Sequence, residues 1–166
     1  MLSRPSRIAP CLWFDDQAEE AAEYYTSIFK DSEITAISRY GEAGREFHGK
    51  EPGSVVTVAF KLEGQPFTAL NGGPLFKFNE AVSLQVNCET QDEVDYYWEK
   101  LSAGGDPQAQ QCGWLKDKFG VSWQVVPTLI SRLLSSQEGQ KTERTMNALF
   151  QMKKLDVAAL QKAYDG

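Results

Sequence analysis

The order of strand, helix and further strands occurs twice along this sequence of 166 residues. Each predicted helix carries an acidic patch and then two tyrosines, Tyr24-Tyr25 in AEEAAEYYTSIF and Tyr96-Tyr97 in QDEVDYYWEKL. One small strand–helix–strand unit cannot bury its sheet face alone, whereas a pair of copies can. The pattern therefore predicts a weak internal duplication, with two unrelated amphipathic helices as the alternative.

The first half is predicted to contain one helix and several strands. The segment 16–30 has apolar residues at three- and four-residue spacing, which predicts an amphipathic helix with Asp15 or Asp16 as its N-cap. A Glu63-Gly64 turn favours a hairpin, and 40–53 is predicted to be a loop or a frayed hairpin. The strands of this half are predicted at 7–14, 32–40, 54–62 and 65–71.

The second half repeats this order. A helix is predicted from Thr90 to Gly105, because Thr90 and Glu93 have the spacing of a capping box and Gly104-Gly105 ends the pattern. Strands are predicted at 81–88, 107–117 and 120–127. After Pro127 the chain is predicted to be helical, with Asp156 capping the last helix. We expect these helices to pack on their own domain, with a subunit contact as the alternative.

Two turns and one core residue can also be predicted from the sequence. Asp117 is expected to hold the reversal at Gly120 through a hydrogen bond from the backbone to its side chain. Trp123 alternates with valines onto the helix-packed face and is predicted to be core. The stretch Asn71-Gly72-Gly73 is predicted to be a turn, with the mouth of a pocket as the alternative.

Composition limits the classes of function. The 42% apolar and 24% charged content is typical of a soluble globular protein. A net charge of −6 argues against nucleic-acid binding, which needs clustered Lys and Arg. Cys11, Cys88 and Cys112 lack metal-ligand spacing and indicate reduced thiols. The N-terminus has no apolar signal region and no long apolar run follows, so we expect a cytoplasmic protein that does not bind a membrane.

Five segments resemble one known family: PCLWFDDQAEEAAEYYTSIF, EGQPFTALNGGP, VSLQVNCETQDEVDYYWEKL, CGWLKDKFGVSWQVVP and MKKLDVAAL. The resemblance is to the PhnB-like, glyoxalase-related branch of the vicinal oxygen chelate (VOC) superfamily, often labelled 3-demethylubiquinone-9 3-methyltransferase. It implies an α+β fold in which paired βαβββ modules form a curved, eight-stranded mixed sheet around one pocket. It also implies a single domain over 1–166, with modules at about 5–74 and 79–127 and a helical extension at 128–166. A homodimer is a further implication.

The resemblance raises the question of cofactors. Metal-using relatives hold a divalent ion with His, Gln or Glu side chains from the first strand of each module and from the last strand. Strand alternation places these positions at Ala9, Ala81 and Gln124, and two methyl groups with one amide cannot replace a cation's water. The only histidine, His48, lies in the loop at 40–53. No Gly-rich strand-to-helix loop is present to bind S-adenosylmethionine. We therefore expect neither a metal nor another cofactor.

The same alternation predicts a ligand pocket. Cys11 is a candidate nucleophile without a nearby base, and a buried core thiol is its alternative. Hydroxyls and amides orient a polar ligand, although they can also satisfy one another. The predicted lining residues are Cys11, Trp13, Ser83, Gln85, Ser122 and Gln124.

The predicted function is metal-independent binding of a small molecule, with an enzymatic activity left open. One alternative is a VOC enzyme that uses a metal or acid–base chemistry, including the methyltransferase label. The other is a structural or interaction dimer with a vestigial pocket.

Overall fold

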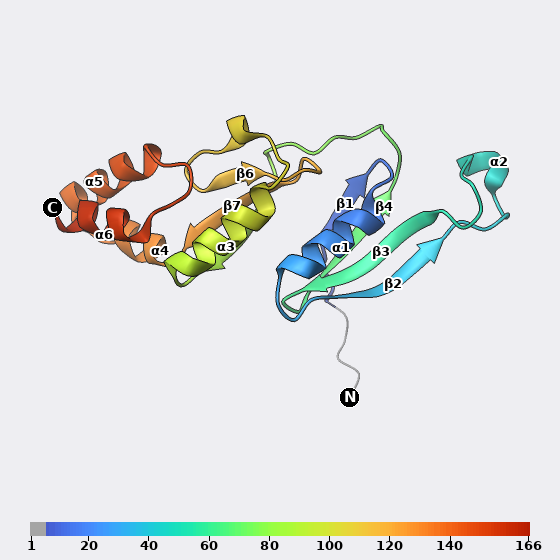
Figure 1. Cartoon of the computed structure of the whole chain (residues 1–166), viewed down its shortest axis with the longest axis horizontal. Coiled ribbons are helices and arrows are strands. Elements are labelled where there is room, and N and C mark those ends of the chain that lie inside the picture. The colour runs from blue at the N-terminus through green and yellow to red at the C-terminus, as the bar shows by residue number, and fades with distance from the viewer. Residues whose placement is uncertain (1–5) are drawn as a thin grey trace. The chain divides into compact units, whose positions relative to one another are not determined.

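The computed structural model describes residues 6–166 and divides the chain into two compact units, Met1–Lys77 and Phe78–Gly166. Both units combine a mixed sheet with helices (Figure 1). The α+β class expected from the sequence is therefore confirmed. The described residues form seven strands in two sheets, where eight strands in one curved sheet were predicted.

The first unit contains β1 (Cys11–Phe14), α1 (Ala18–Ile28), β2 (Glu33–Arg39), α2 (Arg45–His48), β3 (Val55–Leu62) and β4 (Gln65–Asn71). Its sheet has the strand order β1-β4-β3-β2, in which β1 runs parallel to β4 and the other pairs are antiparallel. The predicted β3–β4 hairpin is confirmed. Glu63 and Gly64 both adopt positive φ, the geometry of a tight two-residue turn that suits twisted strands.

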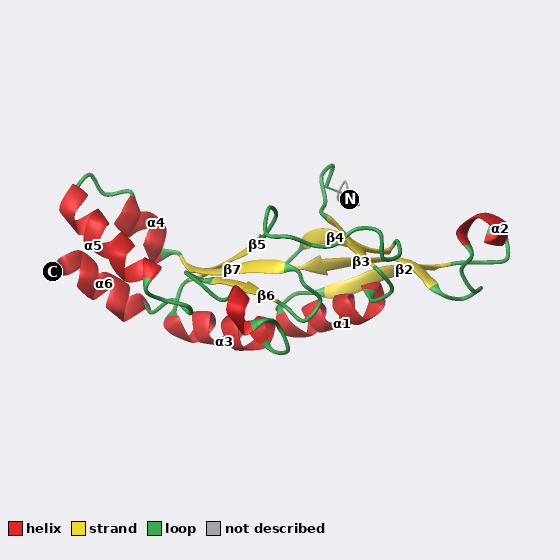
Figure 2. Cartoon of the chain, turned by 90° about the horizontal axis from the view of Figure 1, so that it is seen from above, coloured by secondary structure: helices red, strands yellow, loops and turns green. Residues whose placement is uncertain are grey.

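The helix α1 lies along one face of this sheet (Figure 2). Its alanines Ala18, Ala21 and Ala22 are fully buried and let the helix approach the strands closely. Tyr25 extends the contact by stacking on Phe60 of β3 at a ring-centroid distance of 6.3 Å. The core of this unit is therefore built from small residues near the helix start and aromatic rings near its end.

The predicted N-cap of α1 is wrong. Neither Asp15 nor Asp16 is the cap; Gln17 holds the position and its side chain makes no capping hydrogen bond. Asn71, at the end of β4, supplies the acceptor instead, because the backbone N–H of Ala18 donates to its Oδ1 over 2.8 Å. A residue distant in the sequence thus replaces the local cap.

The segment 40–53 contains the short helix α2, where the sequence predicted a loop or a frayed hairpin. Gly44 and Gly49 flank α2 in left-handed conformations that glycine adopts without strain. His48 lies on α2 beside Tyr40, with ring centroids 4.4 Å apart, and its Nδ1 accepts a hydrogen bond from the backbone of Lys50.

The second unit contains β5 (Leu84–Cys88), α3 (Gln91–Ser102), the 3-10 helix η1 (Pro107–Ala109), β6 (Trp114–Lys116), β7 (Ser122–Pro127), α4 (Leu129–Leu134), α5 (Gly139–Phe150) and α6 (Val157–Asp165). The strand order is β5-β7-β6, with β5 parallel to β7. Thr90 caps α3 by accepting a hydrogen bond from the backbone N–H of Glu93, as predicted.

The strand predicted at 107–117 is the main error in this unit. Pro107 has no N–H for a ladder, and Asp106 caps η1 by accepting from the backbone of Gln108. The chain then reverses at Cys112-Gly113, where both φ angles are positive, and β6 begins only at Trp114. The strand β6 is therefore shorter than predicted, and the second unit has the three strands that the sequence pattern predicts rather than the four that the family resemblance implied.

The helices after Pro127 pack against one another and are hydrogen-bonded to the rest of the second unit. Leu133, Leu155 and Leu160 form a buried cluster, and Asp156 caps α6 as predicted by accepting from the backbone of Ala159. The segment before α6 is hydrogen-bonded to the rest of the unit, because the backbone N–H groups of Cys112 and Gly113 donate to the carbonyls of Met152 and Lys153.

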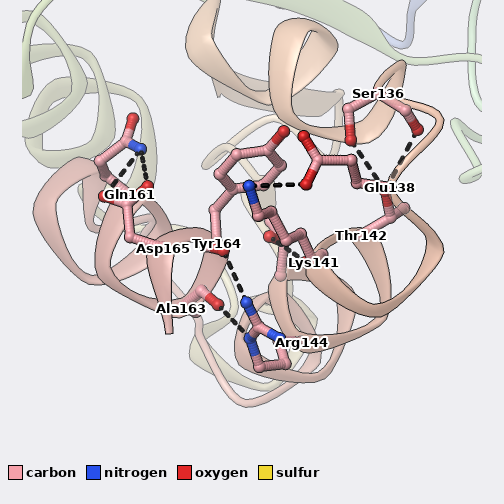
Figure 3. Close-up of polar contacts among 10 residues, drawn as sticks. Ser136, Glu138, Lys141, Thr142, Arg144, Gln161, Ala163, Tyr164 and Asp165 are labelled. Carbon is pink, nitrogen blue, oxygen red and sulfur yellow. Dashed lines mark hydrogen bonds and ion pairs between the residues drawn. The ribbon is translucent and has the colours of Figure 1, made fainter.

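Arg144 of α5 joins α5 to α6. Its guanidinium donates to the backbone carbonyls of Ala163 and Tyr164 at 3.0 and 2.8 Å (Figure 3). A cation at this end of α6 also suits the helix dipole. Within the part of the chain that the structure describes, no helix has the length and apolarity needed to cross a membrane.

Candidate functional site

The sheet of the second unit has one face covered by α3 and one face that no described helix covers (Figure 2). The buried residues Val86, Leu115, Trp123 and Val125 alternate along its strands toward α3. The opposite side is here named the open face. Its residues are Gln85, Asn87, Trp114, Lys116, Ser122, Gln124 and Val126.

Strand register brings the predicted polar residues of this unit together. Gln85 pairs with Gln124 across the parallel β5–β7 ladder, and Ser122 pairs with Lys116 across the antiparallel β6–β7 ladder. Ser83 lies just before β5, and its Oγ accepts a 2.9 Å hydrogen bond from Nε2 of Gln124. Directly paired residues point to the same side of a sheet, so these polar groups share the open face.

The two amides on this face are partly satisfied by neighbours. Gln124 donates to Ser83, and Gln85 donates through Nε2 to Oδ1 of Asn87 over 2.8 Å. The amide–amide interaction weighed as the alternative to a pocket is therefore present in part. Gln85 and Asn87 are exposed, whereas Ser83 and Gln124 are half-buried.

Ser122 differs from its neighbours. It is only 2% exposed, and its Oγ has no hydrogen-bond partner among the described residues. A buried hydroxyl without a partner costs about 1–3 kcal/mol. A hydrogen bond to water or to a bound ligand would satisfy this hydroxyl.

Lys116, the cross-strand partner of Ser122, forms an ion pair with Glu80. The hydrogen bond from Lys116 lowers the pKa of Glu80 below its ordinary value, because that bond favours the ionised carboxylate. The lysine side chain is 28% exposed and the glutamate side chain 62% exposed. The register therefore places one charged side chain, that of Lys116, directly opposite Ser122.

Cys11 and Trp13 lie in the first unit, on the face of β1 opposite the buried Leu12 and Phe14. Cys11 is exposed, so the alternative of a buried core thiol is wrong for this residue. Partial desolvation raises the pKa of its thiol, which disfavours the nucleophilic thiolate. Cys88 is buried and Cys112 half-buried.

Trp13 is held by its own unit. Its Nε1 donates to the carbonyl oxygen of Gly73 over 2.9 Å, and its ring meets Phe76 edge-on at a centroid distance of 4.9 Å. A Cβ added at Gly72 would lie 2.2 Å from the indole, so only glycine leaves room for the ring. Within the stretch 71–73, Asn71 therefore caps α1, and the two glycines hold the indole of Trp13 in place.

A cavity of about 380 Å³ in the first unit was not anticipated from the sequence. Its charged lining residues are Asp15, Asp16, Glu19, Lys50 and Glu51. Arg39 pairs with Glu19 at 3.2 Å and Arg45 pairs with Glu51 at 2.8 Å, which leaves a lining of mixed charge. The signal in the sequence was the Asp15-Asp16 pair, which was assigned to capping.

The chain joins two units, each with a helix packed on a mixed sheet in which the first and last strands run parallel; this defines a protein of the VOC superfamily. The family model described as 3-demethylubiquinone-9 3-methyltransferase matches residues 6–126. The chain therefore belongs to this PhnB-like family, as its sequence indicated.

Solved structures agree with this assignment. A PhnB protein from Bacillus cereus is 38% identical, with a TM-score of 0.64, and the match covers 74% of this chain and 100% of that one. Protein PA1353 from Pseudomonas aeruginosa is 20% identical, with a TM-score of 0.56 and coverages of 74% and 97%. The fosfomycin resistance protein FosX from Listeria monocytogenes, in complex with Mn(II) and sulfate, is 19% identical, with a TM-score of 0.51 and coverages of 80% and 97%. The last two show similarity of fold alone. No curated protein matches the sequence.

The cofactors suggested by these names do not fit the residues present. At the expected metal positions Ala9 and Ala81 have no donor atoms, and the amide of Gln124 is bonded to Ser83. Among residues 6–166, no group of three or more His, Cys, Asp or Glu side chains is arranged to hold a metal ion. The strand-to-helix connections, 15–17 and 89–90, contain no glycine that would let a backbone approach S-adenosylmethionine closely.

Proposed function

We propose that this protein binds a small polar molecule on the open face of the second unit, without a metal. The supporting observation is the unpartnered hydroxyl of Ser122, which lies in a row of hydroxyl and amide groups. A ligand that hydrogen-bonds to Ser122 would recover the free energy lost by burying that group. Binding would thus satisfy a polar group for which the described residues provide no partner.

The chemistry of the set favours binding over acid–base catalysis. Ser83, Ser122 and the two glutamines, Gln85 and Gln124, are neutral donors and acceptors that orient a ligand but transfer no proton readily. The exposed Cys11 thiol has a raised pKa, which argues against a thiolate nucleophile at neutral pH. We therefore favour a binding protein over the enzymatic alternative.

Binding is tested by screening small polar metabolites with thermal shift and ¹H–¹⁵N NMR. A molecule that binds only the folded protein must raise its melting temperature. It should also shift the side-chain amide signal of Gln124, which is assigned from its loss in Gln124→Ala. We expect Ser83→Ala and Gln124→Ala to weaken binding about tenfold, whereas Gln137→Ala, at an exposed turn residue, leaves it unchanged. Hits that persist unchanged in both site variants would place the ligand elsewhere.

Ser122→Ala gives a sharper test. Removing an unsatisfied hydroxyl should leave the free energy of unfolding unchanged or raise it by about 1 kcal/mol, because nothing is lost in the ligand-free protein. The same change should weaken ligand binding. Loss of stability without loss of binding would show that the hydroxyl has a structural role instead.

The homodimer implied by the family resemblance stays a prediction. It belongs to the alternative in which the protein is an interaction module with a vestigial pocket. The helices α4, α5 and α6 pack against one another around the cluster of Leu133, Leu155 and Leu160, and Gln91 of α3 is hydrogen-bonded to the segment that leads into α6. Light scattering on the full chain measures the oligomeric state, and a dimer that binds none of the screened molecules would favour that alternative.

A further inference from the structure

We propose that the ligand carries an anionic oxygen group, such as a carboxylate, which takes the place of Glu80 on Lys116 beside Ser122. This inference rests on the proposed function and specifies the class of molecule that the open face accepts. In the ligand-free protein the carboxylate of Glu80 then occupies the position of the ligand's anionic group and forms the ion pair with Lys116.

Lys116 lies close enough to Ser122 for one ligand group to contact both. Lys116 and Ser122 are directly opposite in the antiparallel β6–β7 pair, so their side chains leave the sheet on the same face and start about 5 Å apart. One anionic group bound to the ammonium of Lys116 therefore lies within reach of the Ser122 hydroxyl. A hydroxyl donates readily to an anionic oxygen, and such charge-assisted bonds are stronger than neutral ones.

Glu80 is positioned so that it can leave Lys116. Glu80 belongs to the turn that precedes β5, where the backbone N–H of Ala81 donates to Oδ1 of Asn79 over 2.9 Å. This local bond positions the glutamate independently of the sheet. Its side chain is 62% exposed, so it can leave Lys116 and become hydrated without any change in the strands.

The ion pair between Lys116 and Glu80 is weak enough for a ligand to replace Glu80. Pairs this exposed contribute little, because water competes for both partners and two side chains lose freedom. A ligand anion replaces the lost contact with Glu80 and adds the bond to Ser122 that the free protein lacks. Neutral groups elsewhere on the ligand would meet the amide of Gln124. Exchange on Lys116 therefore favours a ligand that has both an anionic and a neutral polar part.

The experiment compares propionate with propionamide, which have the same shape and differ in charge, at constant ionic strength and pH 7. Dissociation constants come from NMR titration of the backbone amides of Lys116 and Ser122. We expect Glu80→Gln to tighten propionate binding about two- to fivefold by removing the competitor. Lys116→Met should weaken it about tenfold or more, and Ser122→Ala should weaken it as well. Propionamide binding should respond to neither Glu80→Gln nor Lys116→Met.

A second ion pair of the same unit provides the matched control. Lys154 and Asp95 are also exposed, at 43% and 46%, and pair at 2.7 Å. Asp95→Asn removes one negative charge, as Glu80→Gln does, but it leaves Lys116 paired with Glu80, so it should leave propionate binding unchanged. Equal tightening in both variants would indicate a general charge effect and overturn the inference.

Failure of the inference is distinguishable from failure of the proposed function. If propionamide or a neutral metabolite shifts the Gln124 amide while propionate does not bind even in Glu80→Gln, the open face binds ligands but the anionic class is wrong. If no compound, charged or neutral, perturbs the open face in the wild type or in Glu80→Gln, both are overturned.

Discussion

Trp123 donates its indole N–H to Oδ2 of Asp117 over 2.9 Å, although both residues are buried, with exposures of 2% and 3%. The other carboxylate oxygen, Oδ1, accepts from the backbone N–H groups of Phe119 and Val121 at 2.9 and 3.0 Å. A single carboxylate therefore closes the turn between β6 and β7 and joins that turn to the core beneath α3.

Asp117→Ala should destabilise the protein by about 3 kcal/mol or more, because it removes the acceptor that three buried or half-buried N–H donors share. Asp117→Asn should cost less, since its carbonyl oxygen can still accept from the turn while its NH₂ group faces the indole. Urea unfolding, followed by tryptophan fluorescence, measures both variants. An alanine variant as stable as the wild type would contradict this account of the turn.

The turn at Asp117 shows how far the sequence determines the structure. The Asp-Lys-Phe-Gly stretch predicts a turn held by an aspartate, because that interaction is local. Alternation also predicts that Trp123 is buried, since every second side chain of a strand points toward the core. The bond between them was not predicted, because it depends on the exact reach of two side chains across the β6–β7 register.

The two main errors have different physical causes. The segment 107–117 was predicted to be one strand, whereas Asp106 and Pro107 favour a capped turn locally. The cap of α1 was assigned to Asp15 or Asp16 because they are adjacent, whereas Asn71 reaches the helix only after β4 pairs with β1. In the first case a local turn signal was overlooked, and in the second case a tertiary contact replaced the local cap.

The sequence predicted which residues of the candidate site share one face of the sheet. It did not predict whether their polar groups would find hydrogen-bond partners. Alternation indicated that Ser122 and Gln124 share one side of β7. Whether a hydroxyl finds a partner depends on atomic positions, so the unsatisfied Oγ of Ser122 could not be anticipated. The pairing of Lys116 with Glu80 was missed for a similar reason, because Glu80 lies on a turn outside any periodic pattern.

Gly72→Ala should displace the indole of Trp13. The added Cβ would lie 2.2 Å from the ring, far inside van der Waals contact, and the ring is held by Gly73 and Phe76. We expect a loss of about 1–3 kcal/mol in the free energy of unfolding from this overpacking. Gly41→Ala is the matched control, because no atom lies within 4 Å of its added Cβ.

A double-mutant cycle isolates the contact between Gly72 and Trp13. In a Trp13→Ala background the clash is absent, so Gly72→Ala should then cost much less than in the wild type. The difference between the two costs is the coupling free energy. A coupling near zero would mean that Gly72 is required for some other reason.

Asn71→Ala should destabilise the first unit by about 1–2 kcal/mol, because the N–H of Ala18 and the carbonyl of Val55 both lose a partner. Asn71→Asp keeps the acceptor for α1 but turns a carboxylate oxygen toward the carbonyl oxygen of Val55, so it should recover only the part of the loss that belongs to Ala18. Alanine at Asp15 or Asp16 should change the free energy of unfolding by no more than about 0.5 kcal/mol, as for a surface site. A larger effect at Asp15 than at Asn71 would restore the local cap.

Asp95 connects α3 to the C-terminal helices and should respond to pH. Its pKa is lowered below the ordinary 3.8, first by the hydrogen bond from Lys154 and then by that from Gln91, because both favour the ionised form. A carboxylate with a lowered folded-state pKa stabilises the fold above pH 3.8, and this contribution disappears as pH falls through the lower, folded-state value. Acid should therefore loosen the attachment of the segment before α6 to α3.

An NMR titration of the Asp95 carboxyl carbon tests this prediction. The midpoint should lie below 3.8 in the wild type and rise toward that value in Lys154→Met. Gln91→Ala should raise the midpoint by less, although it should loosen α6 more, because Gln91 also bonds the carbonyl of Leu155 and the N–H of Val157. Added salt should raise the wild-type midpoint, since both partners are exposed. If Lys154→Met leaves the midpoint unchanged, the ion pair does not hold the tail, and the two bonds of Gln91 carry the attachment alone.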